Sequence, residues 1–334
     1  MALARVFLIG TTVTFAAIGT VAFFKKKSDE KLAVAVALPL QVHVEEVPLA
    51  KAVAQPLLPS YIPLAQPVVE ELDEKEAIPD VDRIGRLFAF DSTKLPIVET
   101  LSYTSRVPWL KGRPAWIADY ATYFSTSRHF IARSLNRKVD YFTQKVSPGD
   151  RLNVFKRDKD LKFHLLIDLS RCKMWFYYFD AGTNERVLLK TYRVGVGRVD
   201  AKTASGFLTP TGKYLLGSKI AIYKPATMGF FQDRKVEMIR VFGTRWIPFD
   251  QEVEGCSESA KGFGIHGAPW TLDSSTGEFI EDRSKIGKYD SDGCIRLSSE
   301  DMEELFSVII TKPTTVELVK DYREAKLPGV EKNL

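Results

Sequence analysis

The chain has 334 residues, of which 45% are hydrophobic and 27% are charged, so it can bury a core in roughly two domains of about 150 residues each. Its formal net charge is +5 and the basic residues are scattered, which does not predict nucleic-acid binding but suits an anionic envelope polymer or membrane. Three cysteines without a CxxC pair exclude a disulfide framework and a zinc ribbon. An oxidising compartment would allow Cys172 and Cys256 to pair and leave Cys294 free.

The first 27 residues predict a membrane anchor or signal. Val6 to Phe24 is an uncharged run of 19 residues followed by three lysines, and a helix of this length is sufficient to span a bilayer. No small-residue cleavage site follows directly, which favours an uncleaved anchor over a removed signal peptide. The lysines favour a cytoplasmic location for the rest of the chain. This conflicts with the export expected below, so the topology stays open here.

Residues 28–105 are predicted to be a linker. Prolines recur from Pro39 to Pro79, and a charged run occupies 70–76. Prolines at this density disfavour helices and central strands and give an extended spacer. Such a spacer would hold the following domains away from a membrane.

Residues 106–157 have a globular composition. Apolar residues at helical spacing predict short helices over 116–121 and 131–136. A Pro148-Gly149 turn then leads into a strand within 146–154. The sequence IADYA…IARSLN…VSPGDRLNV resembles a lysin-motif (LysM) domain, a small α+β module, and the resemblance implies binding to glycan strands. The alternative is a helical spacer that packs on the next domain.

Residues 161–320 are predicted to be mostly strand. Segments 163–169 and 173–179 flank a polar break and predict a hairpin. A further strand is expected within 187–197, and the Thr209-Pro210-Thr211-Gly212 turn precedes one at 213–216. A helix capped by Ser298, with acids in its first turn, and a last strand at 314–319 follow. Residues 321–334 are expected to be a tail.

Two motifs in this region suggest cysteine chemistry. His266 lies in GIHG at 264–267, and Cys294 lies in SDGCIRL at 291–297. A single buried cysteine is most often an inert apolar side chain. Here Gly293 permits a sharp turn and close approach of a substrate, and Arg296 supplies a cation that favours a thiolate or holds a carboxylate. The setting therefore favours a thiol nucleophile with an imidazole base.

The order of LIDLSRCKMWFYYF, YRVGVG, TPTGKYLL, GFGIHGAPW, YDSDGCIRLSSEDMEELF and TTVELV resembles the YkuD-type L,D-transpeptidase catalytic domain. The resemblance covers about 160 residues. It implies a mainly β fold with some α, built around a β-sandwich with the cysteine at the end of a groove. It also implies a bacterial enzyme that cross-links peptidoglycan between the third residues of two stem peptides. Its thioester intermediate forms as D-alanine is released, and carbapenems are expected inhibitors.

The resemblance also assigns roles to residues of this chain. Cys294 is the nucleophile and His266 is its base. The N–H groups of Gly293 and Cys294 are candidates for the oxyanion hole, and the Gly267 carbonyl is a candidate to orient the imidazole.

The remaining assigned residues concern the substrate. Arg296, Ser291 and Asp292 are candidates for substrate binding. For Arg296 an ion pair with Asp290 or Asp292 is the alternative. No cofactor or metal is implied.

One departure from the family pattern concerns Asp292, which stands where the family usually has histidine in Ser-His-Gly-Cys. A carboxylate there raises the thiol pKa unless it points away or pairs with Arg296. The change makes hydrolysis, an L,D-carboxypeptidase activity, the alternative to transpeptidation. His266 and Cys294 are also 28 positions apart, with a polar insertion at 273–290 that is a candidate lid.

Two other function classes stay open on the sequence. One is a catalytically impaired peptidoglycan-binding protein. The other is a metal site made from His266, Asp292, Cys294 and Cys256, although zinc ligands usually come with tighter paired spacing. The expected partners are peptidoglycan stem peptides, glycan strands and a membrane, with no nucleic acid and no prediction of oligomeric state. The expected location is the cell envelope, with an inner-membrane anchor and the catalytic domain in the periplasm.

Overall fold

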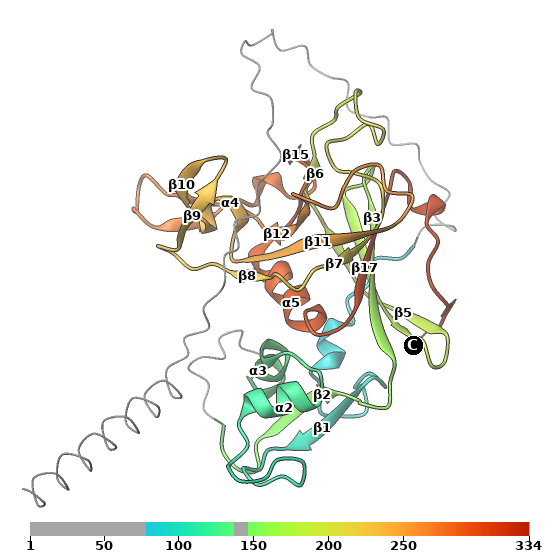
Figure 1. Ribbon diagram of the computed structural model, residues 1–334, viewed down its shortest axis with the longest axis vertical. Helices are drawn as coiled ribbons and strands as arrows, with labels where there is room; N and C mark the ends of the chain where they lie inside the picture. The colour runs from blue at the N-terminus through green and yellow to red at the C-terminus, as the bar shows by residue number, and fades with distance from the viewer. Residues whose placement is uncertain (1–77, 137–145, 334) are drawn as a thin grey trace, which may run out of the picture. The chain divides into compact units, whose positions relative to one another are not determined.

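The computed structural model describes residues 78–136 and 146–333 (Figure 1). The predicted membrane segment therefore lies outside the described residues. Within those ranges no helix is both long and apolar enough to cross a bilayer. The helices and 3-10 turns are η1 (Ile84–Leu87), α2 (Ile117–Tyr123), α3 (Arg128–Asn136), α4 (Ile239–Phe242), η2 (Arg283–Lys285), α5 (Ser299–Ile309) and η3 (Tyr322–Glu324).

Strands make up most of the regular structure, as the sequence predicts. They are β1 (Val98–Ser102), β2 (Arg151–Phe155), β3 (Leu161–Asp168), β4 (Lys173–Asp180), β5 (Glu185–Arg193), β6 (Val196–Gly197), β7 (Gly212–Leu216), β8 (Ala221–Ile222), β9 (Met228–Phe231), β10 (Arg234–Glu237), β11 (Arg245–Glu254), β12 (Gly264–Gly267), β13 (Trp270–Leu272), β14 (Phe279–Glu281), β15 (Tyr289–Ser291), β16 (Ile295–Leu297), β17 (Thr314–Val319) and β18 (Val330–Glu331).

The first part of the described chain is a small α+β domain with the order β1, α2, α3, β2. Its two strands pair antiparallel, with Val98 opposite Phe155 and Ser102 opposite Arg151. Both helices lie where helical spacing predicts them, and Ala121 and Ile131 are buried on their inner faces.

The predicted linker, residues 28–105, extends too far toward the C-terminus. Residues 78–105 include η1 and β1, and Leu87, Leu95 and Ile97 are at most 1% exposed. The proline-based prediction failed here because β1 is short and borders Pro96, while its burial depends on a partner strand more than fifty residues later.

One large sheet dominates the rest of the described chain, in the order β16-β12-β11-β7-β17-β3-β4-β5-β18. The predicted hairpin is present, because β3 and β4 pair antiparallel from Leu161–Asp180 to Asp168–Lys173. β17 lies parallel to β3, and β11 carries two register shifts against β7. Such irregularities bend a strand, so the sheet curls instead of staying flat.

The main core lies against this sheet and continues into the small domain. Phe130 of α3 packs against Phe155 in a tilted arrangement with ring centroids 4.6 Å apart, and the Phe155 ring lies 5.9 Å from that of Phe163 of β3. All three rings are buried in one cluster. The hydroxyl of Ser127 also donates to the carbonyl of Ser307 in α5. The small domain therefore contributes side chains to the main core, and it also has a cluster of its own around Tyr120 and Ile131.

Two further expectations differ from the structure. The predicted tail at 321–334 contains η3 and β18, and β18 pairs with β5. The three cysteines are free thiols. Cys172 lies in the β3–β4 turn with φ 51° and Cys256 follows β11, so the suggested disulfide between them is absent.

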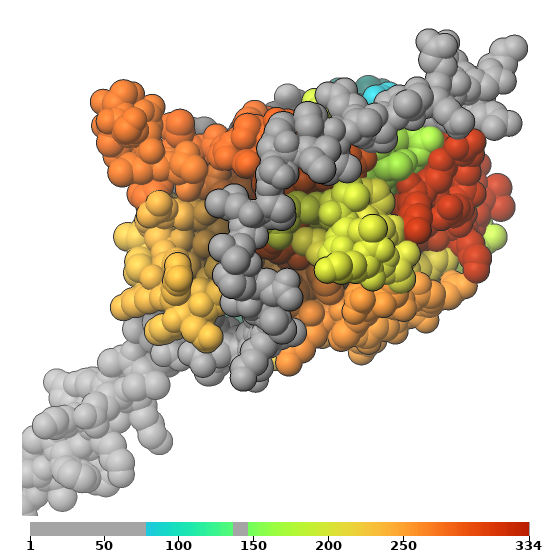
Figure 2. Space-filling view, turned by 90° about the horizontal axis from the view of Figure 1, so that it is seen from above, coloured from blue at the N-terminus to red at the C-terminus, as the bar shows by residue number. Residues whose placement is uncertain are grey.

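Two hairpins lie beside β12. The first is β9–β10, and the second is β13–β14, which occupies part of the predicted lid insertion. Figure 2 shows the first in yellow next to the second in orange, and α4 contacts both. Phe242 and Trp246 belong to an apolar cluster under these hairpins and pack against the ring of His266 at 5.3 and 5.9 Å. Phe242 of α4 and Trp246 of β11 thus form one wall of the region around His266, and the hairpins contribute Val236 and Trp270 to the same cluster.

Candidate active site

The two motifs singled out in the sequence lie on neighbouring strands. β12 pairs parallel with β16, which places His266 beside Arg296 and Ile265 beside Ile295. Ile265 and Ile295 point into the core, since both are 0% exposed. Because side chains alternate along a strand, His266, Arg296 and Cys294, two positions before Arg296, face the other side. The pairing of β12 with β16 thus brings together two motifs that are 28 positions apart in the sequence.

Residues 291–294 form the loop that carries Cys294, the nucleophile loop, and the side chain of Ser291 holds this loop from within. The Ser291 hydroxyl donates to the Cys294 carbonyl at 2.7 Å and accepts from the Gly293 N–H at 3.1 Å. The side chain is 1% exposed. It therefore shapes the nucleophile loop, whereas the sequence suggested substrate contact for Ser291.

Thr209 holds the same loop from outside. Its hydroxyl donates to the Gly293 carbonyl at 2.9 Å and accepts from the Gly197 N–H at 2.7 Å, and the residue is fully buried. Gly293 has φ +121°, and a Cβ there would lie 2.5 Å from the Phe263 ring. Only glycine fits this backbone at this distance.

Cys294 is half-buried at the end of the loop. Its thiol donates to the Gly262 carbonyl at 3.7 Å. Burial raises the thiol pKa to about 12, and the Asp292 carboxylate acts in the same direction. The Gly264 N–H and the Arg296 cation lower it by less. The resting thiol is therefore protonated at neutral pH.

His266 is 3% exposed and its Nδ1 lies 2.7 Å from the Gly267 carbonyl. A carbonyl only accepts, so Nδ1 carries the hydrogen and Nε2 keeps a lone pair. Burial lowers the imidazole pKa to about 3, and Arg296 adds to this effect. The resting imidazole is thus neutral with the tautomer that a base needs. No hydrogen bond joins it to the Cys294 thiol in this structure.

Arg296 and Asp292 have separate ion-pair partners. Arg296 Nη1 lies 2.9 Å from Asp290, which also binds Lys285 at 3.0 Å. Asp292 instead binds Arg198 at 2.5 Å. The pairing of Arg296 with Asp290 is thus one of the two that the sequence left open. The Nε of Arg296 is buried without a hydrogen-bond partner among the described residues.

The Gly293 N–H is already used by Ser291, so of the two predicted oxyanion donors the Cys294 N–H is the better placed. Sequence reasoning missed the role of Thr209, because it interprets the TPTG motif as a turn and as part of the family pattern without a contact to the nucleophile loop. It also missed Arg198, which lies 94 positions from Asp292 and carries no local signal. Both residues act through contacts that form only in the folded chain, between segments far apart in the sequence.

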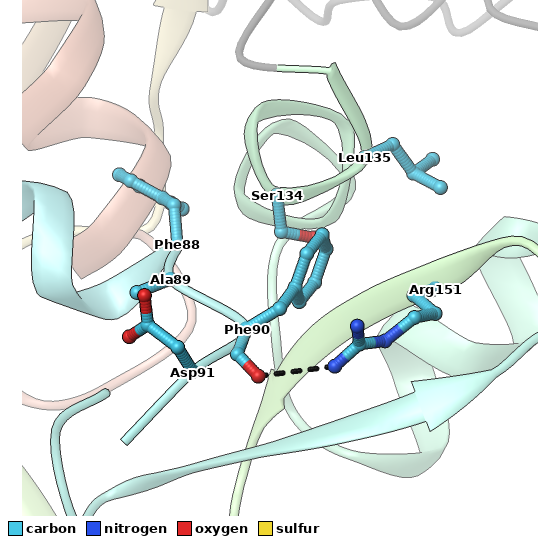
Figure 3. Close-up of a pocket in the computed structure, with 7 residues that line it drawn as sticks. All are labelled: Phe88, Ala89, Phe90, Asp91, Ser134, Leu135 and Arg151. Carbon is cyan, nitrogen blue, oxygen red and sulfur yellow. Dashed lines mark hydrogen bonds between the residues drawn. The ribbon is translucent and has the colours of Figure 1, made fainter. Parts of the chain in front are cut away.

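A separate pocket lies in the small domain, between the segment after η1, the end of α3 and the start of β2 (Figure 3). Its volume is about 490 Å³, and Phe90 and Arg151 form part of its wall. Arg151 donates to the Phe90 carbonyl at 3.0 Å and its guanidinium lies 4.6 Å from the Phe90 ring. Within the described ranges, this pocket included, no group of three or more histidine, cysteine or acidic side chains is placed to hold a metal ion.

The segment of the chain that contains most of the large sheet matches a known protein family. Residues 162–318 match the family model of the YkuD L,D-transpeptidase catalytic domain. This match confirms the sequence prediction for that part of the chain. A comparison with curated proteins found no match.

Two solved structures show similarity over part of the chain. The helical cell shape determining protein Pgp2 from Campylobacter jejuni is 18% identical with a TM-score of 0.32, over 51% of this chain and 50% of that chain. Bd1075 from Bdellovibrio bacteriovorus is 12% identical with a TM-score of 0.32, over 48% of each chain. The chain thus spans about half the length of these proteins.

Proposed function

We propose that this chain, which carries a YkuD L,D-transpeptidase catalytic domain at 162–318, is a bacterial cell-wall acyltransferase with Cys294 as nucleophile. One observation carries the proposal. Cys294 ends a glycine loop fixed by Ser291 and Thr209, beside a strand whose buried His266 has its basic nitrogen free of hydrogen. A fixed thiol beside an oriented imidazole is the arrangement that acyl transfer requires.

The first step is acylation. The Cys294 sulfur attacks the carbonyl between the third residue of a tetrapeptide stem, a diamino acid, and its terminal D-alanine. A C–S bond forms, and the thiol proton moves to His266 Nε2. The C–N bond then breaks and the proton passes to the amine of the departing D-alanine. Because both groups are neutral at rest, proton transfer accompanies the attack.

The second step decides between two activities. In transpeptidation a side-chain amine of a second stem attacks the thioester, gives its proton to His266 and forms the cross-link. In carboxypeptidation water takes the same path and a tripeptide is released. Asp292 is two-thirds exposed and bound to Arg198, so position 292 supplies no second imidazole, besides that of His266, to receive an amine. We retain transpeptidation as the proposal and carboxypeptidation as its alternative.

The test is incubation of the full chain with a disaccharide-tetrapeptide, followed by mass spectrometry beside Cys294→Ala. A Cys294-dependent dimer that has lost one D-alanine establishes transpeptidation. Tripeptide alone establishes carboxypeptidation. Neither product, together with no covalent carbapenem adduct on Cys294, overturns the catalytic proposal in favour of a peptidoglycan-binding protein.

A second activity, glycan binding by the small domain, is favoured by two observations. The β–α–α–β order agrees with the LysM-like resemblance noted in the sequence, and the pocket of Figure 3 presents Phe90 beside Arg151. Aromatic and arginine faces suit sugar rings with polar rims. Co-sedimentation with insoluble peptidoglycan tests this. Phe90→Ala is expected to weaken it, whereas Phe230→Ala, an exposed aromatic residue on the β9–β10 hairpin, is the matched control.

The proposed location is the cell envelope, with Val6–Phe24 as an inner-membrane anchor and the catalytic domain in the periplasm. The support is the uncharged run in the sequence and the chemistry of the proposed substrate. Membrane fractionation tests the anchor, and protease access to the catalytic domain in spheroplasts tests the side. Full recovery in the soluble fraction would overturn the anchor.

A further inference from the structure

The backbone of Arg198 is hydrogen-bonded to the nucleophile loop. Its N–H donates to the Ser291 carbonyl at 3.0 Å, and its own carbonyl accepts from Leu208 at 2.8 Å. The preceding Gly197 binds Thr209, the residue that holds the Gly293 carbonyl. The backbone of Arg198 is therefore fixed relative to Cys294 although its side chain lies at the surface.

The side chain of Arg198 keeps hydrogen-bond donors to spare. Its Nη2 binds Asp292, and both side chains are well exposed, at 59% and 66%. Within the described residues its Nε and Nη1 have no partner. A guanidinium has five N–H donors, so it can hold Asp292 and a second carboxylate together.

The other cations near the loop are already engaged. Arg296 and Lys285 share Asp290, and the Arg296 side chain is only 16% exposed. Among these three cations Arg198 has the most exposed side chain, at 59% against 38% for Lys285 and 16% for Arg296.

We propose that Arg198 forms a carboxylate-binding subsite beside Cys294, which takes the terminal carboxylate of the stem peptide. This inference rests on the proposed function. In a tetrapeptide, that carboxylate lies one residue beyond the amide that Cys294 attacks. When this amide lies at Cys294, the carboxylate is therefore close enough for a side chain beside the nucleophile loop to bind it. The Arg198 guanidinium is already oriented there by Asp292. The subsite selects stems that end one residue after the scissile bond, and longer or amidated stems lose the contact.

Binding to an inert enzyme tests the subsite without turnover. Full-chain Cys294→Ala is titrated by calorimetry with two ligands, a tetrapeptide stem with a free C-terminal carboxylate and the same stem with a C-terminal carboxamide. The titrations are repeated with Arg198→Ala added. The matched control adds Lys202→Ala, which removes an exposed cation from the same loop region.

The expected result is that the acid binds about tenfold more tightly than the amide, and that Arg198→Ala removes this preference by weakening only the acid. Arg198→Lys keeps part of it, because an ammonium retains the charge but not the fork. Lys202→Ala leaves it unchanged. Equal binding of acid and amide, binding of neither, or an unchanged preference in Arg198→Ala overturns the subsite.

Turnover by the wild-type chain separates this outcome from failure of the proposed function. Cys294-dependent product with no acid preference overturns the subsite and leaves the acyltransferase proposal standing. Absence of product from the acid, with the acid preference intact in binding, overturns the acyltransferase and leaves a carboxylate-recognising binding site.

Discussion

At Cys294 and His266, burial opposes the thiolate–imidazolium pair that many cysteine nucleophiles form at rest. Desolvation raises the thiol pKa to about 12 and lowers the imidazole pKa to about 3. Both shifts favour the neutral forms. The thiolate is therefore generated during attack, as the thiol proton passes to His266 Nε2 and from there to the departing amine.

This neutral pair predicts the pH dependence of Cys294 alkylation. Because its thiolate fraction is small throughout, the iodoacetamide rate constant is expected to rise about tenfold per pH unit from pH 7 to 10. Mass spectrometry of the Cys294 peptide isolates this thiol from Cys172 and Cys256. A plateau below pH 8 would show a resting ion pair and contradict the prediction.

Thr209 supplies the second prediction at this scale. Thr209→Val keeps the shape but leaves the buried Gly197 N–H and Gly293 carbonyl without their partner, a loss of about 1–3 kcal/mol in the free energy of unfolding. Acylation is expected to slow with it as the loop loosens. Thr209→Ser keeps the hydroxyl and serves as the control. Urea unfolding and carbapenem acylation rates give the comparison, and a valine variant indistinguishable from wild type would refute it.

At the scale of helices and strands, the sequence predicts the elements that carry a recognisable pattern within their own residues. The β3–β4 hairpin is marked by two apolar runs around a polar break, and α5 by Ser298, whose hydroxyl accepts from the Asp301 N–H. β1 was missed, because five residues near a proline carry little pattern and their burial comes from β2.

The site was predictable to the same extent. Cys294 and His266 stand in motifs with their own glycines. The roles of Thr209 and Arg198 instead arise from contacts across 84 and 94 positions, which no local spacing reveals.

The nucleophile loop itself depends on one backbone conformation. Gly293→Ala puts a Cβ 2.5 Å from the Phe263 ring and 2.8 Å from the Leu208 carbonyl at φ +121°. Displacement of Cys294 is expected to slow acylation on the order of a hundredfold. Gly206→Ala is the control, because Gly206 also has positive φ, at +80°, but open space around it. Equal effects of the two variants on acylation would mean that strain alone, and not the clash, matters.

For the molecule as a whole, buried neutral histidines couple stability to acid. His129 of α3 and His266 of β12 both have a pKa lowered from 6.5 to about 3, chiefly by burial. A lowered folded-state pKa means that the stabilisation is complete above pH 6.5 and is lost as the pH falls toward 3. Each histidine contributes a slope of at most about 1.4 kcal/mol per pH unit in that window.

His129→Gln is therefore expected to flatten the fall of the unfolding free energy between pH 6 and 4 by up to about 1.4 kcal/mol per unit. Denaturant unfolding at several pH values measures the slope for this variant and wild type. Between pH 7 and 8 the difference between the two must stay constant, which is the internal control. An unchanged slope at acidic pH would show that His129 is charged in the folded state.

Because the small domain and the sheet share buried side chains, the position of an N-terminal truncation is expected to decide whether the remaining chain folds cooperatively. A fragment that starts at residue 106 loses β1, the antiparallel partner of β2, together with Leu87, Leu95 and Ile97. Burial of a large apolar side chain contributes about 1.5–3 kcal/mol, so these losses approach the roughly 5–15 kcal/mol that stabilises a domain. The fragment is expected to lack a cooperative thermal transition, whereas a fragment from Ile78 retains one. Cooperative melting of the shorter fragment with intact carbapenem acylation would mean that the sheet folds independently of the small domain.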